Sequence, residues 1–135
     1  MAAQGKLVLL VDDDVDFVSV NRMTLEKAGY RVVSAHTGHD GMQLAVDNPI
    51  DVAVLDVMMG TPDEGFELAR KMRNDERTKK IPLIMLTSIN DDLRQKRLPT
   101  FSNRDRDEAW LPVDRFVEKP LTPQRLLSLV KDLTA

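Results

Sequence analysis

Three short runs of the sequence, at residues 7–11, 52–55 and 82–86, consist of apolar residues alone. Each run is too short for a helix, and none alternates polar and apolar residues as a strand with one wet face does. Such runs are typical of strands that are buried on both faces of a sheet. Residues 30–35 and 115–117 include polar side chains but keep β-branched and aromatic ones, so they predict two further strands.

Segments with the 3.6-residue spacing of a helix lie between these runs, at 16–28, 39–47 and 65–74. A further helix is expected after Thr122 and Pro123, which suit the N-cap and the first helical position. The residues of the first helix that we expect to face the core are Phe17, Val18, Val20, Leu25 and Ala28. Strands and helices therefore alternate along most of the chain.

This alternation predicts a parallel sheet, because each right-handed crossover helix packs back onto the sheet and covers one of its faces. Five strands suit a flavodoxin-like doubly wound α/β fold with strand order 2-1-3-4-5 and helices on both faces. A chain of 135 residues fits a single domain, 1–135, with a core from about 6 to 134. Residues 88–114 contain two prolines and no clean apolar stripe. We expect an irregular or lengthened connection there, with only a short helix near 91–98.

The composition excludes several classes of function. The 22 acidic and 19 basic residues give a net charge of −3, which provides no general positive field for nucleic acid. The absence of cysteine excludes disulfides, and the N-terminal residues contain neither a signal-peptide core nor a membrane span. His36 and His39 have no acidic or cysteine partner at ligand spacing, so we expect them in an exposed loop. A cytoplasmic protein that binds neither nucleic acid by itself nor a membrane is the expectation.

Polar side chains follow four of the predicted strands. They are Asp12, Asp13 and Asp14 after the first strand, Asp56 after the third, Thr87 after the fourth and Lys119 near the end of the fifth. The carboxyl ends of parallel strands meet at one edge of the sheet, which is where open α/β sheets bind ligands. Carboxylates held close together favour a hard cation, and oxygen ligands without cysteine or histidine favour Mg²⁺. A carboxylate, a hydroxyl, a lysine and Mg²⁺ are together equipped for phosphoryl transfer.

Five motifs resemble the receiver domain of two-component signalling, and the likeness covers nearly the whole chain. The motifs are LVLLVDDD at 7–14, DVAVLDVMMG at 51–60, EGFELAR at 64–70, IPLIMLTS at 81–88 and FVEKP at 116–120. The resemblance implies a CheY-like response regulator of the stand-alone type, a monomer or a phosphorylation-dependent dimer. It implies a chain that takes a phosphoryl group from a histidine kinase or a histidine phosphotransfer protein and then signals to a downstream protein. Enzymatic activity is not expected beyond its own phosphorylation and dephosphorylation.

The resemblance also assigns a role to each matching position. Asp13 would bind Mg²⁺ directly, Asp12 would act mainly through water, and Met58 would contribute its backbone carbonyl. Asp56 would be both a metal ligand and the phosphoacceptor.

Three further positions complete the set that the resemblance implies. Thr87 matches the switch hydroxyl, and Lys119 matches the lysine that pairs with the phosphoryl group. Phe116 occupies the place of the aromatic residue that moves inward when the threonine turns toward the phosphate.

Two segments depart from the family pattern. Gly60 stands where the family usually has proline, and one extra residue precedes Gly65. The separation between Thr87 and Lys119 is longer than in most receivers, and the usual Gly-Ala-Asp approach to the fifth strand is absent. We therefore expect a reshaped fourth helix and a specialised partner.

Other interpretations of the same residues remain open. Residues 12–14 could be a solvated turn that caps the next helix. A small phosphatase of the haloacid dehalogenase type would use Asp12 and Asp14 as nucleophile and acid, but it leaves Asp56 without a role. A receiver that binds its partner without being phosphorylated is the third possibility.

Overall fold

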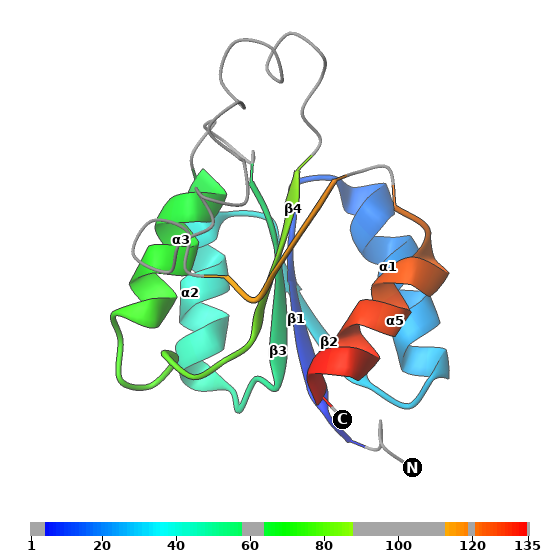
Figure 1. The fold of residues 1–135 in the computed structure, drawn as a ribbon, viewed down its shortest axis with the longest axis horizontal. Helices are drawn as coiled ribbons and strands as arrows, with labels where there is room; N and C mark the ends of the chain where they lie inside the picture. The colour runs from blue at the N-terminus through cyan, green and yellow to red at the C-terminus, as the bar shows by residue number, and fades with distance from the viewer. Residues whose placement is uncertain (1–4, 58–63, 88–112, 119–120, 135) are drawn as a thin grey trace, which may run out of the picture.

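Five parallel strands form one sheet in the computed structural model (Figure 1). The structure describes residues 5–57, 64–87, 113–118 and 121–134. The strands are β1 (Leu7–Val11), β2 (Arg31–Ala35), β3 (Val52–Asp56), β4 (Leu83–Thr87) and β5 (Arg115–Glu118). Their order in the sheet is β2-β1-β3-β4-β5, which confirms the predicted doubly wound fold.

The described helices pack on both faces of the sheet. They are α1 (Val15–Lys27), α2 (Gly38–Asp47), α3 (Glu64–Arg73) and α5 (Pro123–Thr134). Helices α2 and α3 cover one face, and α1 and α5 cover the other (Figure 1). Helix and strand ends differ from the predicted ones by no more than one residue. The short helix predicted near 91–98 lies outside the described residues. None of the described helices has the length and apolar character that a membrane span requires.

Side chains of the sheet alternate between two core layers. On β1, Leu7, Leu9 and Val11 pack with α2 and α3, whereas Val8 and Leu10 pack with α1 and α5. None of these five residues is more than 3% exposed. Both faces of the strand are dry, which is why its sequence contains no polar residue. Truncating such a buried leucine to alanine costs about 2–5 kcal/mol of stability. The two core layers therefore hold the central strands, and the residues at their ends, firmly in position.

One core prediction for α1 is wrong. Val20 was expected to face the core, but it is 49% exposed, and the buried residues are Val18, Asn21 and Leu25. The spacing of these three residues follows one helix face, whereas Val20 lies two residues beyond Val18, about 200° around the helix axis. Apolar character alone therefore misled the prediction. Asn21 is accommodated because its Nδ2 donates a hydrogen bond to the Phe17 carbonyl oxygen at 2.8 Å.

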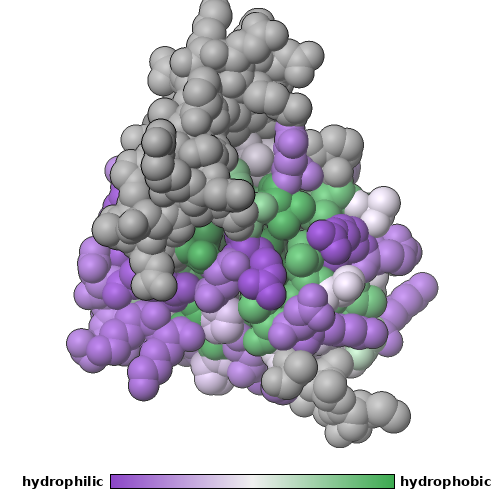
Figure 2. Space-filling model, viewed as in Figure 1, coloured by the Kyte–Doolittle hydropathy of each residue, from purple (hydrophilic) through white to green (hydrophobic). Residues whose placement is uncertain are grey.

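Strand β5 forms one edge of the sheet and is its least buried strand. Phe116 and Val117 are half-buried, and the residues at the two ends of the strand, Arg115 and Glu118, are exposed. The space-filling view shows apolar surface near the middle of this face of the molecule, with hydrophilic side chains around it (Figure 2). The edge strand therefore depends on contacts other than deep burial for its position.

Candidate functional site

Three strands end in polar residues at the same edge of the sheet. Asp12 directly follows β1, Asp56 is the last residue of β3, and Thr87 is the last residue of β4. The parallel register aligns these ends, since Val11 of β1 pairs with Leu55 of β3, and Asp56 of β3 pairs with Leu86 of β4. All three polar side chains are buried, with exposures of 2%, 3% and 4%. Polar groups buried at this level are retained where they have a partner or a ligand to serve.

The predicted acidic residues converge. Asp12, Asp13 and Asp56 each offer a carboxylate oxygen, and these oxygens all lie within 4.8 Å of one another. Two unit charges at such a separation repel by about 3 kcal/mol at an effective dielectric constant of about 20. Ligand atoms around one Mg²⁺ ion lie about 3–4 Å apart, so these oxygens need only a small closure to share an ion. The donor set is entirely oxygen, and it therefore fits Mg²⁺.

The neighbouring backbone holds Asp12 in this position. Its Oδ1 accepts a hydrogen bond from Asp14 N at 2.9 Å, and its own N–H donates to the Ala35 carbonyl oxygen at 3.1 Å. The exposed ring of His36 lies beside it, with Nδ1 2.9 Å from the Asp12 carbonyl oxygen. His36 and His39 are both exposed, as predicted, but His39 lies in the first turn of α2 and not in a loop. The turn after β1 is therefore tied to β2 as well as to the start of α1.

Asp14 has a different role from its two neighbours. It is the N-cap of α1, where its Oδ1 accepts a hydrogen bond from Phe17 N at 3.1 Å. The capping interpretation is thus correct for Asp14, whereas Asp12 and Asp13 belong to the carboxylate cluster. A dehalogenase-type site would need Asp14 as its acid, but in the structure the Asp14 carboxylate caps α1 by accepting a hydrogen bond from Phe17 N.

Thr87 presents a buried hydroxyl at the same edge. Its Oγ1 has no hydrogen-bond partner among the described residues. Its strand neighbour Leu86 pairs with Asp56, so the hydroxyl and the carboxylate belong to adjacent strand ends. An unsatisfied buried hydroxyl costs about 1–3 kcal/mol, which favours a ligand that supplies an acceptor here.

Of the remaining predicted residues, Phe116 is described by the structure, whereas Met58 and Lys119 are not. Phe116 pairs with Met85 and packs against the core layer under α2 and α3, which is the layer that Met85 also joins. Side chains two residues apart on a strand share a face, so Thr87 and Phe116 lie on the same face of the sheet. Met58 and Lys119 lie outside the described residues, and their roles stay predictions.

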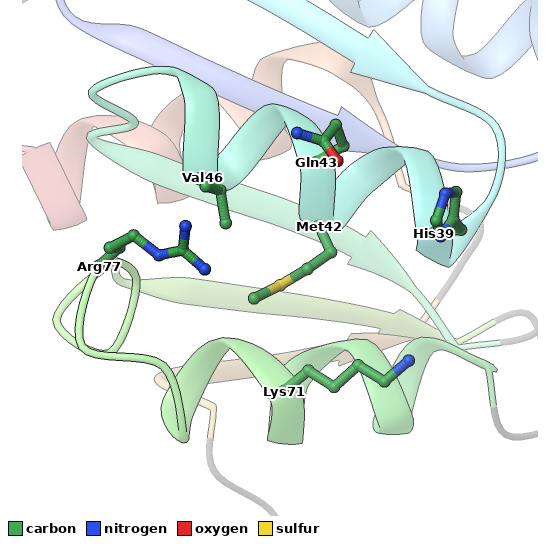
Figure 3. Close-up of a pocket in the computed structure, with 6 residues that line it drawn as sticks. All are labelled: His39, Met42, Gln43, Val46, Lys71 and Arg77. Carbon is green, nitrogen blue, oxygen red and sulfur yellow. The ribbon is translucent and has the colours of Figure 1, made fainter.

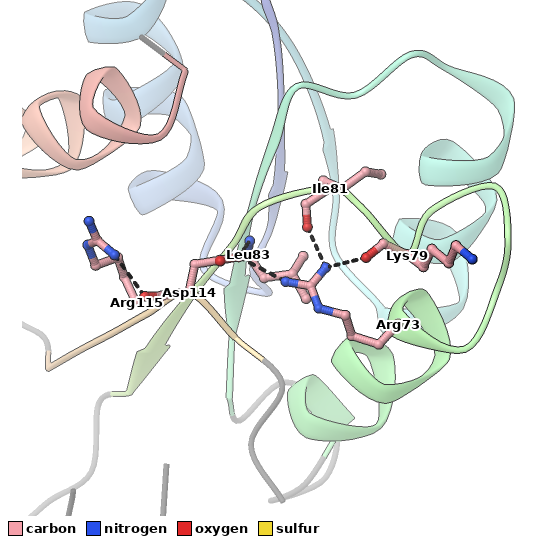
Figure 4. Close-up of polar contacts among 6 residues, drawn as sticks. All are labelled: Arg73, Lys79, Ile81, Leu83, Asp114 and Arg115. Atoms are coloured by element: carbon pink, nitrogen blue, oxygen red, sulfur yellow. Dashed lines mark hydrogen bonds and ion pairs between the residues drawn. The ribbon is translucent and has the colours of Figure 1, made fainter. Parts of the chain in front are cut away.

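The start of β5 is held by an ion pair that sequence analysis does not predict (Figure 4). Arg73 Nη2 lies 2.8 Å from Asp114 Oδ2, and the same oxygen accepts a hydrogen bond from Leu83 N at 2.8 Å. Arg73 Nη1 also donates to the carbonyl oxygens of Lys79 and Ile81, at 3.0 and 2.5 Å. These contacts fix β5 against the first residue of β4. No sequence signal could have found them, because the two charged residues lie far apart along the chain.

The structure also has a shallow pocket of about 240 Å³ between α2 and α3 (Figure 3). It is lined by His39, Met42, Gln43, Val46, Lys71 and Arg77. None of the predicted site residues lies in it. The carboxylate edge is therefore a separate feature from this pocket.

Comparisons with known proteins agree on one family. The family model of the response regulator receiver domain matches residues 8–131. The transcriptional regulatory protein GltR of Pseudomonas aeruginosa is 36% identical over 98% of this chain and 50% of GltR. The chemotaxis response regulator CheY4 of Vibrio cholerae is 26% identical, with a TM-score of 0.77 over 96% of this chain and 99% of that chain. The DrrB receiver domain, solved in a BeF3-activated form, is 31% identical, with a TM-score of 0.70 over 96% of this chain and 97% of that chain.

This chain spans about half the length of the curated relatives that it matches first. The regulatory activity in the names of those relatives belongs to the longer proteins, and the stand-alone arrangement expected from the sequence stays a prediction. Because the family match extends from the first strand into the last helix, this chain belongs to the response regulator receiver domain family.

Proposed function

We propose that this chain accepts a phosphoryl group on Asp56 from a phosphohistidine of a histidine kinase or a histidine phosphotransfer protein. The observation that carries the proposal is the convergence of the Asp12, Asp13 and Asp56 carboxylates at the edge of the sheet where Thr87 also ends its strand with a buried hydroxyl. Transfer of a phosphoryl group needs a nucleophile, a site for a divalent cation and hydrogen-bond donors. This edge of the sheet offers a carboxylate nucleophile, a cluster of oxygen ligands for the cation, and one hydroxyl donor.

In this proposal one carboxylate oxygen of Asp56 attacks the phosphorus of the donor. The new oxygen–phosphorus bond forms as the nitrogen–phosphorus bond of phosphohistidine breaks, and the imidazole leaves with the electron pair and takes up a proton. Asp12, Asp13, Asp56 and the Met58 carbonyl would hold Mg²⁺, which offsets the charge that develops on the phosphoryl oxygens. The low exposure of Asp56, 3%, limits the access of water to the nucleophile.

Thr87 and Lys119 would bind the phosphoryl group once it is attached. The Thr87 hydroxyl can donate a hydrogen bond to a phosphoryl oxygen and so satisfy a group that is otherwise buried without a partner among the described residues. Lys119 would pair with a second oxygen as a point charge. Movement of Thr87 frees space on the sheet face that it shares with Phe116, and that change would carry the signal to a protein partner.

The similarity to the DrrB receiver domain, solved in a BeF3-activated form, supports this proposal at 31% identity. The name of GltR is that of a transcriptional regulator, and this chain covers half of it. We propose a protein as the direct downstream partner of the receiver domain itself, because its net charge of −3 provides no general positive field for nucleic acid.

The test is to incubate the protein with Mg²⁺ and acetyl phosphate and to weigh the intact chain by mass spectrometry. We expect wild type and Asp16→Ala to gain one phosphoryl group, because Asp16 is an exposed carboxylate outside the cluster. Asp56→Ala should gain none. An adduct that persists in Asp56→Ala would place the nucleophile elsewhere, and no adduct in any variant would favour a receiver that binds its partner without phosphorylation.

A further inference from the structure

Gly65, the second residue of α3, lies directly against the backbone of Asp56. A Cβ atom at this position would be 2.1 Å from the Asp56 carbonyl oxygen, 2.8 Å from its carbonyl carbon and 2.7 Å from Val57 Cα. Non-bonded carbon atoms prefer separations of about 3.5–4.0 Å. The obstructing atoms belong to the main chain, so no change of rotamer relieves the overlap. Any side chain at position 65 must move either α3 or Asp56.

The requirement for glycine here is one of space and not of backbone conformation. The described glycines with positive φ are Gly5 and Gly29, so Gly65 has a conformation that alanine also adopts. In a helix alanine is more favourable than glycine by about 1 kcal/mol. A change from Gly65 to alanine therefore suits the helix and disturbs the contact with Asp56.

Two hydrogen bonds hold this turn of α3 in place. Gly65 N donates to the Val57 carbonyl oxygen at 2.9 Å, next to Asp56. Glu64 Oε2 accepts a hydrogen bond of 2.5 Å from the N–H of Gly38, the first residue of α2. That amide belongs to the first turn of α2, whose N–H groups have no partner within the helix. The Glu64 carboxylate therefore caps α2 and ties the start of α3 to it.

We propose that Gly65 and Glu64 are positioning residues for the reaction at Asp56, an inference that rests on the proposed function. Because it has no side chain, Gly65 allows the Asp56 main chain to lie directly against α3, and so sets the position of the Asp56 carboxylate relative to Asp12 and Asp13. Glu64 holds the first turn of α3 against α2, so that Gly65 cannot retreat. Both residues act through Asp56.

The cluster tolerates little displacement of Asp56. Its three carboxylate oxygens lie within 4.8 Å of one another, and ligand oxygens around one Mg²⁺ ion lie about 3–4 Å apart, so a shift of Asp56 away from the other two would keep its oxygen from sharing the ion. Misplacement of a reacting group by about 1 Å lowers rates by about 100-fold. We expect Gly65→Ala to weaken Mg²⁺-dependent binding of beryllofluoride by at least about tenfold.

The test compares Gly65→Ala with a matched change at Gly41. A Cβ at Gly41 would be 2.8 Å from Val11 Cγ2 and 3.2 Å from Leu68 Cδ2, so Gly41→Ala crowds the same core layer without touching Asp56. Binding is followed by ¹⁹F NMR well below the unfolding temperature, where lower stability changes the apparent affinity only through the folded fraction. Gly41→Ala should bind within about twofold of wild type. Wild-type affinity in Gly65→Ala, or equal losses in both variants, would overturn the proposal.

A second pair of variants tests Glu64 and decides the matter if Gly65→Ala fails to fold. Glu64→Gln keeps an oxygen that can accept from Gly38 N and should bind beryllofluoride nearly as wild type does. Glu64→Ala removes the acceptor and should bind at least about threefold more weakly. Equal binding by Glu64→Ala and Glu64→Gln would contradict the positioning role. Failure of the wild type itself to bind beryllofluoride with Mg²⁺ would instead remove the proposed function, and the inference with it.

Discussion

At the scale of single residues, the site places charge where a folded protein otherwise avoids it. Asp12 and Asp56 are 2% and 3% exposed. One carboxylate oxygen of each lies within 4.8 Å of the other and of an oxygen of Asp13. Repulsion among these three carboxylates opposes folding, and a bound cation would relieve it. Carboxylates so close together lower the stability of the protein. The arrangement is therefore better explained as a binding site than as a stabilising contact.

Neutralising one carboxylate should therefore stabilise the protein without Mg²⁺ and reduce its response to Mg²⁺. We expect Asp13→Asn to raise the melting temperature by about 2–5 °C in EDTA, and Mg²⁺ to stabilise it less than it stabilises wild type. Thermal unfolding with and without Mg²⁺ measures both effects. Asp14→Asn is the control, since asparagine also serves as an N-cap and Asp14 lies outside the cluster. Equal responses of the two variants to Mg²⁺ would count against the shared cation site.

A second carboxylate, in the turn after α3, provides a test that depends on pH. A side-chain hydrogen bond from Arg77 lowers the pKa of Asp75 from 3.8 to about 2. Because the pKa is lower in the folded state, this contact stabilises the protein above about pH 4 and is lost as the pH falls toward 2. The effect on unfolding should be small, because Arg77 is exposed to solvent. Arg77→Ala should return the pKa of Asp75 toward 3.8 in an NMR titration of its carboxyl carbon, whereas an unchanged pKa would exclude the hydrogen bond as the cause.

At the scale of elements, the strands differ in what holds them. The central strands β1, β3 and β4 are buried along their whole length, whereas β5 has no fully buried residue. Its start is fixed instead by Asp114, which binds Arg73 and accepts a hydrogen bond from Leu83 N. This contact sets the register in which Glu118 pairs with Thr87. The register of the edge strand therefore rests on polar contacts at the end of the sheet far from the site.

Removing the Asp114 carboxylate should loosen that edge. We expect Asp114→Ala to lower the free energy of unfolding by about 1–2 kcal/mol, because Leu83 N and Arg73 each lose an acceptor. Urea unfolding measures the change, and Asp132→Ala, an exposed carboxylate of α5, is the control. A double-mutant cycle with Arg73→Ala should give a coupling of about 0.5–1 kcal/mol, since the pair is partly exposed. A coupling of zero would mean that the ion pair does not hold β5.

At the scale of the whole molecule, the sequence predicted the strand order and the edge at which the carboxylates meet. It could do so because strands that are buried on both faces leave uninterrupted apolar runs, and because parallel strands bring their carboxyl ends together. Predictions failed where tertiary packing decides, as at Val20, which is apolar but lies on the outer face of α1. The pairing of Arg73 with Asp114 joins segments far apart in the chain, and the contact of Gly65 with Asp56 depends on how α3 packs against the end of β3. No periodicity or local propensity records such contacts.

The most direct measurement locates the phosphoryl group itself. Sodium borohydride reduces an acyl phosphate to a primary alcohol, so a phosphorylated aspartate becomes homoserine. The protein is phosphorylated in the presence of Mg²⁺, reduced, digested and sequenced by mass spectrometry. The proposed function predicts homoserine at position 56 and at no other aspartate. Homoserine at position 12 or 13, or none at all after complete reduction, would contradict it.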